Sequence, residues 1–191
     1  MKSNRLEAFS DGVLAIVITI MVLEFKVPEE VTLHALIPVI PVFISYVISF
    51  IYIGIYWNNH HHLFQITQKV NGKILWANLH LLFWLSLIPF VTSWIGENHA
   101  ASTPVGIYGI VLLMSGIAYF ILQKVIISHH EDDFALKKAI GKNMKGKLSM
   151  VLYAIGVLLS FVNPWLAIAC YIFVAIMWVV PDIRIEKILH K

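Results

Sequence analysis

The chain has 191 residues, of which 59% are hydrophobic and only 13% are charged. Soluble domains carry about 25% charged residues, so this composition excludes an ordinary soluble protein and predicts an integral membrane protein. The net charge of +3 is small, and the single cysteine, Cys170, excludes an intrachain disulfide.

Apolar segments separated by polar residues predict six membrane-spanning helices in a single domain over residues 1–191. In chain order they cover residues 6–25, 33–57, 74–95, 105–127, 148–162 and 165–180. We expect Pro164 to begin the sixth helix, because a proline inside a helix removes a backbone hydrogen bond. The last two segments are short for a crossing, so a re-entrant hairpin over 148–180 is an alternative.

Basic residues are distributed unevenly between the two sides that six spans would define. One side carries 13 of the 14 Lys and Arg residues, and only Lys26 lies on the other. Positive charge stays in the cytoplasm during insertion, so we expect both termini inside. Residues 128–147 form the one long polar segment, where Asp132 or Asp133 is expected to cap a short helix reaching Ile140.

The first predicted span carries acidic residues where hydrocarbon is expected. Residues 13–23 are apolar except for Thr19, but eleven helical residues cover only about 17 Å of the roughly 30 Å required. The helix must therefore include residues 6–12, which bring Glu7, Ser10 and Asp11 to or below the membrane surface. An ionised carboxylate there costs several kcal/mol unless it is paired or hydrated, so Asp11 needs partners.

The predicted topology places polar residues from the second and third spans on the same membrane face as Asp11. They are Trp57, Asn58, Asn59, His60, His61, His62, Asn78 and His80. We expect Ser10 and Asp11 to accept hydrogen bonds from an imidazole, an indole or an amide of this set, which would fix the base of the first helix. The alternative is that these are ordinary interface residues whose polar ends reach water.

The three consecutive histidines do not predict a metal site. Neighbouring residues on a helix point about 100° apart, so His60, His61 and His62 cannot all face one ion. A proton-sensing role suits one of them better, since imidazole titrates near neutral pH. The sequence also lacks a phosphate-binding glycine loop, a nucleophile elbow and a carboxylate pair, so we expect no enzymatic activity.

One face of the first span carries a regular stripe. Positions i, i+4, i+7 and i+11 are occupied by Gly12, Ile16, Thr19 and Leu23. In a monomer this is a packing stripe, which is the simpler interpretation of the periodicity. In a symmetric oligomer with this helix at the axis, apolar rings gate by dewetting and a hydroxyl ring coordinates a passing cation.

The start of the first span carries the motif R-x-x-x-F-S-D-G, formed by Arg5, Phe9, Ser10, Asp11 and Gly12. It resembles the hallmark of the lysosomal/endosomal potassium channel family and its prokaryotic relatives. The resemblance extends over essentially the whole chain, through Trp57, His60, His61, His62, Asn78 and His80. It implies that the motif anchors a pore helix against these partners and need not touch ions.

The resemblance implies an all-α homotetramer of six-span units with the first helix lining a central pore. Ile16 and Leu23 would form aliphatic constrictions, with a polar ring of Thr19 between them. The implied function is a potassium-preferring leak-type cation channel in a prokaryotic plasma membrane, without a filter loop or a cofactor. Its partners would be other copies of the chain, membrane lipid and potassium ions, and no nucleic acid.

Two other functions remain open from the sequence. A proton-linked membrane transporter would use Asp11 and the cytoplasmic-side histidines and would show saturable transport. A membrane metalloenzyme built on the histidine-rich edge would require bound iron or zinc.

Overall fold

The computed structural model describes residues 3–65, 67, 69–129 and 144–180, and this part of the chain is helical, as predicted. The helices are α1 (Ser3–Leu23), the 3-10 helix η1 (Leu33–Val39), α2 (Ile40–Gln65), α3 (Gly72–Ser86), α4 (Ile88–Glu97), α5 (Ser102–His129), α7 (Met144–Ser160) and α8 (Pro164–Val179). The short helix expected before Ile140 lies outside the described residues.

Four helical stretches are long and apolar enough to cross a membrane. They are Ser3–Leu23, Leu33–Gln65, Gly72–Glu97 and Ser102–His129. The last two helices have 17 and 16 residues. At about 1.5 Å per residue they are about 25 Å long, shorter than a hydrocarbon core of roughly 30 Å. They form a hairpin whose second helix begins at Pro164, as predicted, after Asn163 accepts a hydrogen bond from the Trp165 amide.

Two predicted segments differ from the helices observed. The third is divided at Leu87 into α3 and α4, because Pro89 has no amide hydrogen and its ring displaces the carbonyl one turn earlier. The second continues past Trp57 to Gln65, so the histidines lie on the helix and not after it. Polar residues ended the predicted segment, but hydrogen bonds to neighbouring helices keep them within α2.

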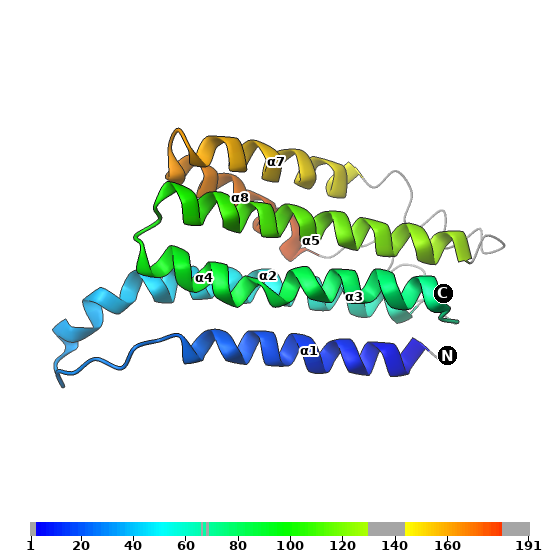
Figure 1. The fold of residues 1–191 in the computed structure, drawn as a ribbon, viewed down its shortest axis with the longest axis horizontal. Helices are drawn as coiled ribbons and strands as arrows, with labels where there is room; N and C mark the ends of the chain where they lie inside the picture. The colour runs from blue at the N-terminus through cyan, green and yellow to red at the C-terminus, as the bar shows by residue number, and fades with distance from the viewer. Residues whose placement is uncertain (1–2, 66, 68, 130–143, 181–191) are drawn as a thin grey trace.

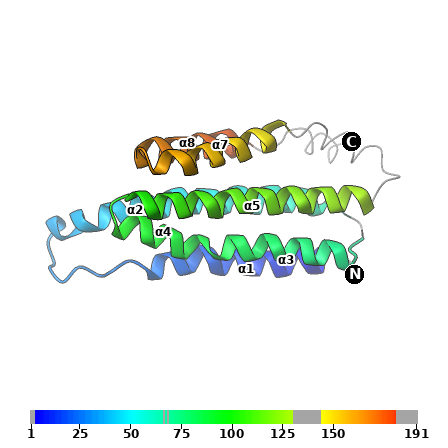
Figure 2. The same ribbon diagram turned by 45° about the horizontal axis from the view of Figure 1, so that its top comes forward.

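The helices stack in three layers. The hairpin of α7 and α8 forms one outer layer, α2 and α5 lie in the middle, and α1, α3 and α4 form the other outer layer (Figures 1 and 2). Helix α1 packs on α2, α3 and α4. It therefore lies at the edge of the subunit opposite the hairpin.

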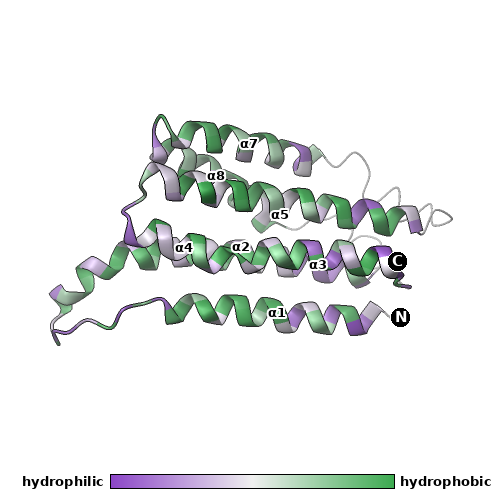
Figure 3. Ribbon diagram, viewed as in Figure 1, coloured by the Kyte–Doolittle hydropathy of each residue, from purple (hydrophilic) through white to green (hydrophobic). Residues whose placement is uncertain are grey.

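Polar residues gather at one end of the bundle. Figure 3 shows hydrophilic residues along the first turns of α1, at the start of α3 and at the end of α5, all near the N-terminus. The centres of the helices are apolar. This end is where the sequence analysis placed the cytoplasmic surface.

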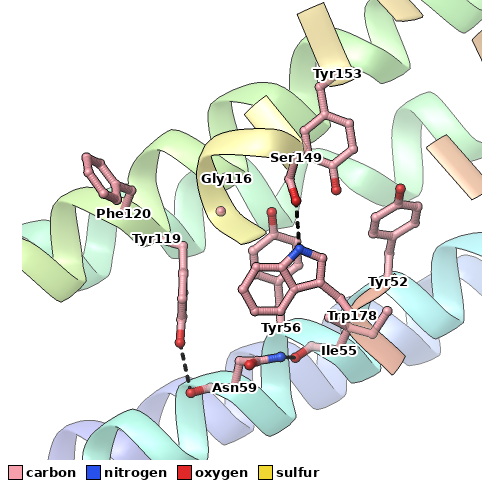
Figure 4. Close-up of a pocket in the computed structure, with 11 residues that line it drawn as sticks. Tyr52, Ile55, Tyr56, Asn59, Gly116, Tyr119, Phe120, Ser149, Tyr153 and Trp178 are labelled. Atoms are coloured by element: carbon pink, nitrogen blue, oxygen red, sulfur yellow. Dashed lines mark hydrogen bonds between the residues drawn. The ribbon is translucent and has the colours of Figure 1, made fainter. Parts of the chain in front are cut away.

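A tyrosine connects the hairpin to the middle layer, and a tryptophan connects the two helices of the hairpin to each other. The Tyr52 hydroxyl donates to the Tyr171 carbonyl, and the Trp178 indole donates to Ser149 Oγ at 2.7 Å. Tyr52 and Trp178 are among the residues that line a cavity of about 50 Å³ between α2, α5, α7 and α8 (Figure 4). On α5, Gly116 lies beside this cavity. The hairpin is thus held by hydrogen bonds and close aromatic packing, which matter most where lipid and protein are equally apolar.

Close packing of α5 against Tyr171 predicts different effects of two glycine substitutions. A methyl group at Gly109 would lie 2.6 Å from Tyr171 Cζ, whereas at Gly116 it would make ordinary contacts with Tyr153 at 3.7 Å. We expect Gly109→Ala to destabilise the purified protein by about 1–3 kcal/mol, the usual cost of overpacking, in thermal or denaturant unfolding.

The matched control is Gly116→Ala, one heptad along the same helix, which should leave stability unchanged or raise it. Equal effects of the two substitutions would contradict the packing described for Tyr171.

Candidate functional site

Helix α1 has one buried face and one exposed face. The buried face is formed by Leu6, Ser10, Leu14, Val17 and Met21. The exposed face includes Ile16 and Leu23, which are 58% and 80% accessible. Within the described part of the subunit the stripe is therefore exposed, which argues against its simpler interpretation as an intrachain packing face.

The small and polar positions of the stripe are also open. A side chain at Gly12 would meet nothing within 4 Å. The Thr19 hydroxyl donates to the backbone carbonyls of Ala15 and Ile16, each at 3.0 Å. Because its hydrogen is directed to the backbone, the hydroxyl presents oxygen lone pairs outward.

A buried hydrogen-bonded chain fixes the base of α1. Ser10 Oγ donates to the Leu6 carbonyl at 2.9 Å and accepts from Asn78 Nδ2 at 2.9 Å. Asn78 Oδ1 then accepts from His60 Nε2 at 2.8 Å. All three polar side chains are buried. The predicted amide donor to Ser10 is confirmed, and the imidazole joins it one bond further away.

The acceptor role of Asn78 determines the tautomer of His60. Its Nε2 carries the hydrogen, so Nδ1 is the unprotonated nitrogen. Nδ1 is buried and has no hydrogen-bond partner among the described residues. A second proton there would have no acceptor, which favours the neutral ring.

Asp11 accepts from an indole, one of the three kinds of donor that the sequence left open. Trp57 Nε1 donates to Asp11 Oδ1 at 3.0 Å. Trp57 is 47% accessible, so this bond lies at the surface of the single subunit. The acid is therefore paired but stands at the edge of the buried chain.

Glu7 is a second acid at this site, and its partner was not predicted. His61 Nδ1 lies 2.6 Å from Glu7 Oε1, and its Nε2 lies 2.8 Å from the Gln65 side-chain amide. His61 was one of the candidate partners for the motif, and within the described residues its Nδ1 bonds Glu7, the acid one turn before Ser10 and Asp11. The sequence could have indicated this role of Glu7, because Glu7 precedes Ser10 by three residues and so lies on the same side of the helix as Ser10.

His80 does not join the motif, which corrects another prediction. Its Nε2 accepts from Trp84 Nε1 on the same helix at 3.0 Å. Asn78 and His80 are two residues apart, about 200° around a helix, so they cannot both face α1.

Arg5 and Phe9 are exposed, on the side of α1 away from the subunit core. Arg5 makes no hydrogen bond or ion pair within the part of the chain that the structure describes. Over the same part, no three His, Cys, Asp or Glu residues are grouped as a metal site requires.

A groove of about 650 Å³ runs between α1 and α4 beside the stripe. Ile16 and Ile20 line one wall and Phe90 the other. Near its far end Lys26 Nζ lies 2.8 Å from Glu97 Oε1, and this hydrogen bond and charge raise the pKa of Lys26. The groove is open in the single subunit, and it is continuous with the exposed face of α1.

Comparisons with known proteins identify similar chains. Residues 5–89 match the family model described as endosomal/lysosomal potassium channel TMEM175. The chain is 58% identical over 191 residues to a potassium channel of Chryseobacterium sp. (strain P1-3), covering 100% of both. It is 28% identical over 148 residues to the Gallus gallus endosomal/lysosomal proton channel TMEM175, covering 69% of this chain and 30% of that protein.

The fold also matches a solved structure. It is similar, with a TM-score of 0.79 and 28% identity, to the lysosomal potassium-selective channel TMEM175 homolog from Chamaesiphon minutus. The match covers 94% of this chain and 97% of that one. The likeness thus includes the hairpin of α7 and α8 as well as the helices around the motif.

The buried chain at the base of α1 predicts energetic coupling between Ser10 and Asn78. In a double-mutant cycle of Ser10→Ala and Asn78→Ala, we expect a coupling free energy of about 0.5–3 kcal/mol in unfolding measurements. The physical reason is that each single change leaves a buried partner without its hydrogen bond. The control cycle pairs Ser10→Ala with His80→Ala and should be additive. Additivity in both cycles would contradict the described geometry.

Proposed function

We propose, from the premise that this chain belongs to the TMEM175 family of endosomal/lysosomal potassium channels, that four copies surround a potassium-preferring pore lined by α1. The family and the relatives are channels, so the chain is a membrane channel protein and not an enzyme. The observation that carries the proposal is the exposed stripe on α1. It is available to line an axis because no helix in the described part of its own subunit covers it.

Four stripes facing one axis would give stacked rings. Ile16 and Leu23 would form two apolar constrictions, and Thr19 would form a polar ring between them. Successive positions rise about 1.5 Å, so Ile16 and Thr19 would be separated by about 4.5 Å along the axis. Narrow apolar rings hold a pore closed when they dewet, and Ile16 is stiff because it is branched at Cβ.

The Thr19 ring accounts for a preference for cations. Its hydroxyl hydrogen is engaged with the α1 backbone, and oxygen lone pairs are left for the axis. Four such oxygens would attract a partly dehydrated potassium ion and repel an anion. Selectivity would then arise from side-chain oxygens, since the sequence has no Thr-Val-Gly-Tyr-Gly motif of the kind that forms a carbonyl-lined filter.

The motif would act as an anchor for this helix. Ser10 binds α3 through Asn78, and Asp11 binds α2 through Trp57. Both bonds leave the stripe free and fix the rotation of α1 about its own axis. Arg5 and Phe9, which are exposed, would then contact neighbouring copies.

The groove between α1 and α4 supports the assembly of several copies. It is bordered by Ile16 and Ile20 on α1 and by Phe90 on α4. A large exposed apolar groove next to a proposed axis is suited to helix packing from a neighbouring subunit. A homotetramer would cover this groove while leaving the stripe facing the axis.

The positions of the acidic residues on α1 are more consistent with a channel than with a proton-linked transporter. Glu7 and Asp11 lie in the N-terminal half of α1, where His61 and Trp57 bind them. A transporter would place titrating acids near the midplane, close to its substrate. Relatives are named both potassium and proton channels, so a flux assay must report both ions.

Both termini would face the cytoplasm of a prokaryotic cell, with the protein in the plasma membrane. Among described basic residues, Lys73 lies in the first turn of α3 and Lys124 near the end of α5, and Figure 3 shows both of these helix ends at the polar end of the bundle. Lys26 lies at the other end and is paired with Glu97. This asymmetry supports the orientation by the positive-inside rule.

Potassium flux through reconstituted protein tests the proposal. Liposomes loaded with potassium and diluted into sodium should lose potassium in a conductive, non-saturable manner, and Ile16→Asn should raise the flux several-fold. The added amide hydrates the apolar ring and so lowers the dewetting barrier. A protonophore and a pH dye would report charge-compensating proton entry, and the same vesicles without protonophore would report proton leak.

The matched control is Ile176→Asn on α8, which is 64% accessible and lies in the layer opposite α1. It introduces the same side chain on an exposed apolar surface and should leave flux unchanged. Unaltered potassium flux through an assembled Ile16→Asn protein would contradict the proposed pore. Saturable uptake of a substrate would favour the transporter.

A further inference from the structure

A second groove lies between α2 and α8, at the end of the bundle away from the start of α1. Its volume is about 340 Å³, within the range of about 300–1,000 Å³ that is usual for ligand sites. Ile44 and Ile48 form the α2 wall, and Ile168 and Ile172 form the α8 wall. The groove is therefore large enough for a ligand and apolar along its length.

The hydroxyl groups in this groove already have hydrogen bonds. Ser45 Oγ donates to the Val42 carbonyl at 2.9 Å, and Tyr108 Oη shares a hydrogen bond with Ser49 at 3.0 Å. Tyr171 Oη donates to the Val105 carbonyl at 3.3 Å. Water needs two to four polar partners to occupy a buried site, and the walls offer few. The groove suits hydrocarbon better than water.

The groove adjoins exposed apolar residues of α2 and α8. Ile44 and Phe43 on α2 are each 54% accessible, and Phe173 on α8 is 55% accessible. Helix α8 lies in the layer opposite α1, so the groove does not border the exposed stripe (Figure 2). Lipid is thus the medium with direct access to it.

The rim of the groove carries two amphipathic rings. Trp165 at the start of α8 is 69% accessible, and His99 is exposed at the turn before α5. His99 and Ala100 both have positive φ values, 48° and 58°, so the turn adopts an uncommon left-handed backbone. Ring N–H groups of this kind lie at the headgroup level of membranes, where they donate to phosphate and carbonyl oxygens.

We infer that this groove binds one acyl chain of a phospholipid, with the headgroup at Trp165 and His99. Apolar walls with N–H donors only at the rim match the chemistry of that molecule. The bound chain would fill the space between α2 and α8 and hold the hairpin against the middle layer. The inference does not depend on where the pore lies.

Photochemical labelling tests it. The protein would be reconstituted with a phosphatidylcholine that carries a diazirine in one acyl chain, irradiated, and mapped by mass spectrometry. We expect adducts to be several-fold more frequent at Ile168 and Ile172 than at Phe173 and Ile176, which are more exposed. Ile172→Trp should fill the groove and abolish the excess at Ile168, whereas Phe173→Trp should preserve it.

Ile44→Trp fills the same groove from the opposite wall and should have the same effect, in case one variant fails to fold. If the adduct frequency along α8 simply increases with the accessibility of each residue, the inference is overturned, because such labelling would come from bulk lipid only. Absence of lipid adducts at the groove, as expected if a second copy of the chain covers it, would overturn it too.

Discussion

The structure depends on the need to satisfy polar groups at the base of α1. A buried serine, amide and imidazole form one chain from α1 through α3 to α2, with Ser10, Asn78 and His60 as its members. In hydrocarbon each unpaired group would cost about 1–3 kcal/mol or more. Because the bonds need particular directions, they fix the rotation of α1 as well as its position. The exposed face of α1 follows from that rotation.

The rest of the bundle is built without a large hydrophobic driving force. Lipid is as apolar as the side chains it contacts, so packing depends on close approach and on hydrogen bonds. Tyr171 packs against glycines of α5 and α7. Trp178 bonds Ser149 within the hairpin, and Tyr52 on α2 bonds the backbone of α8. Different contacts thus hold the two outer layers. The buried polar chain holds α1, and glycine contacts and aromatic hydrogen bonds hold the hairpin.

The sequence predicted the helices and the kinds of donor at the base of α1, and the predictions that differ from the structure do so for physical reasons. The lengths of the apolar segments predicted the helices. The cost of an unpaired acid predicted that Ser10 and Asp11 accept hydrogen bonds, without specifying which residue donates each one. To predict which donor bonds which acceptor, the rotation of each helix about its own axis must be known. His80 lies on the same helix as Asn78, but its side chain points to a different side of that helix and bonds Trp84. Glu7 bonds His61 because the two side chains lie on the facing sides of α1 and α2. Sequence spacing fixes such faces within one helix and leaves open how two helices are rotated against each other.

The most direct test of the account is whether the stripe on α1 meets permeating ions. In a Cys170→Ala background, Thr19→Cys would place a thiol between the two apolar rings, and silver ions would be applied during potassium flux. The account predicts rapid block that high potassium slows, and no block in the matched Ile176→Cys variant. Flux that continues after the thiol introduced by Thr19→Cys has been shown to react would contradict a pore lined by α1.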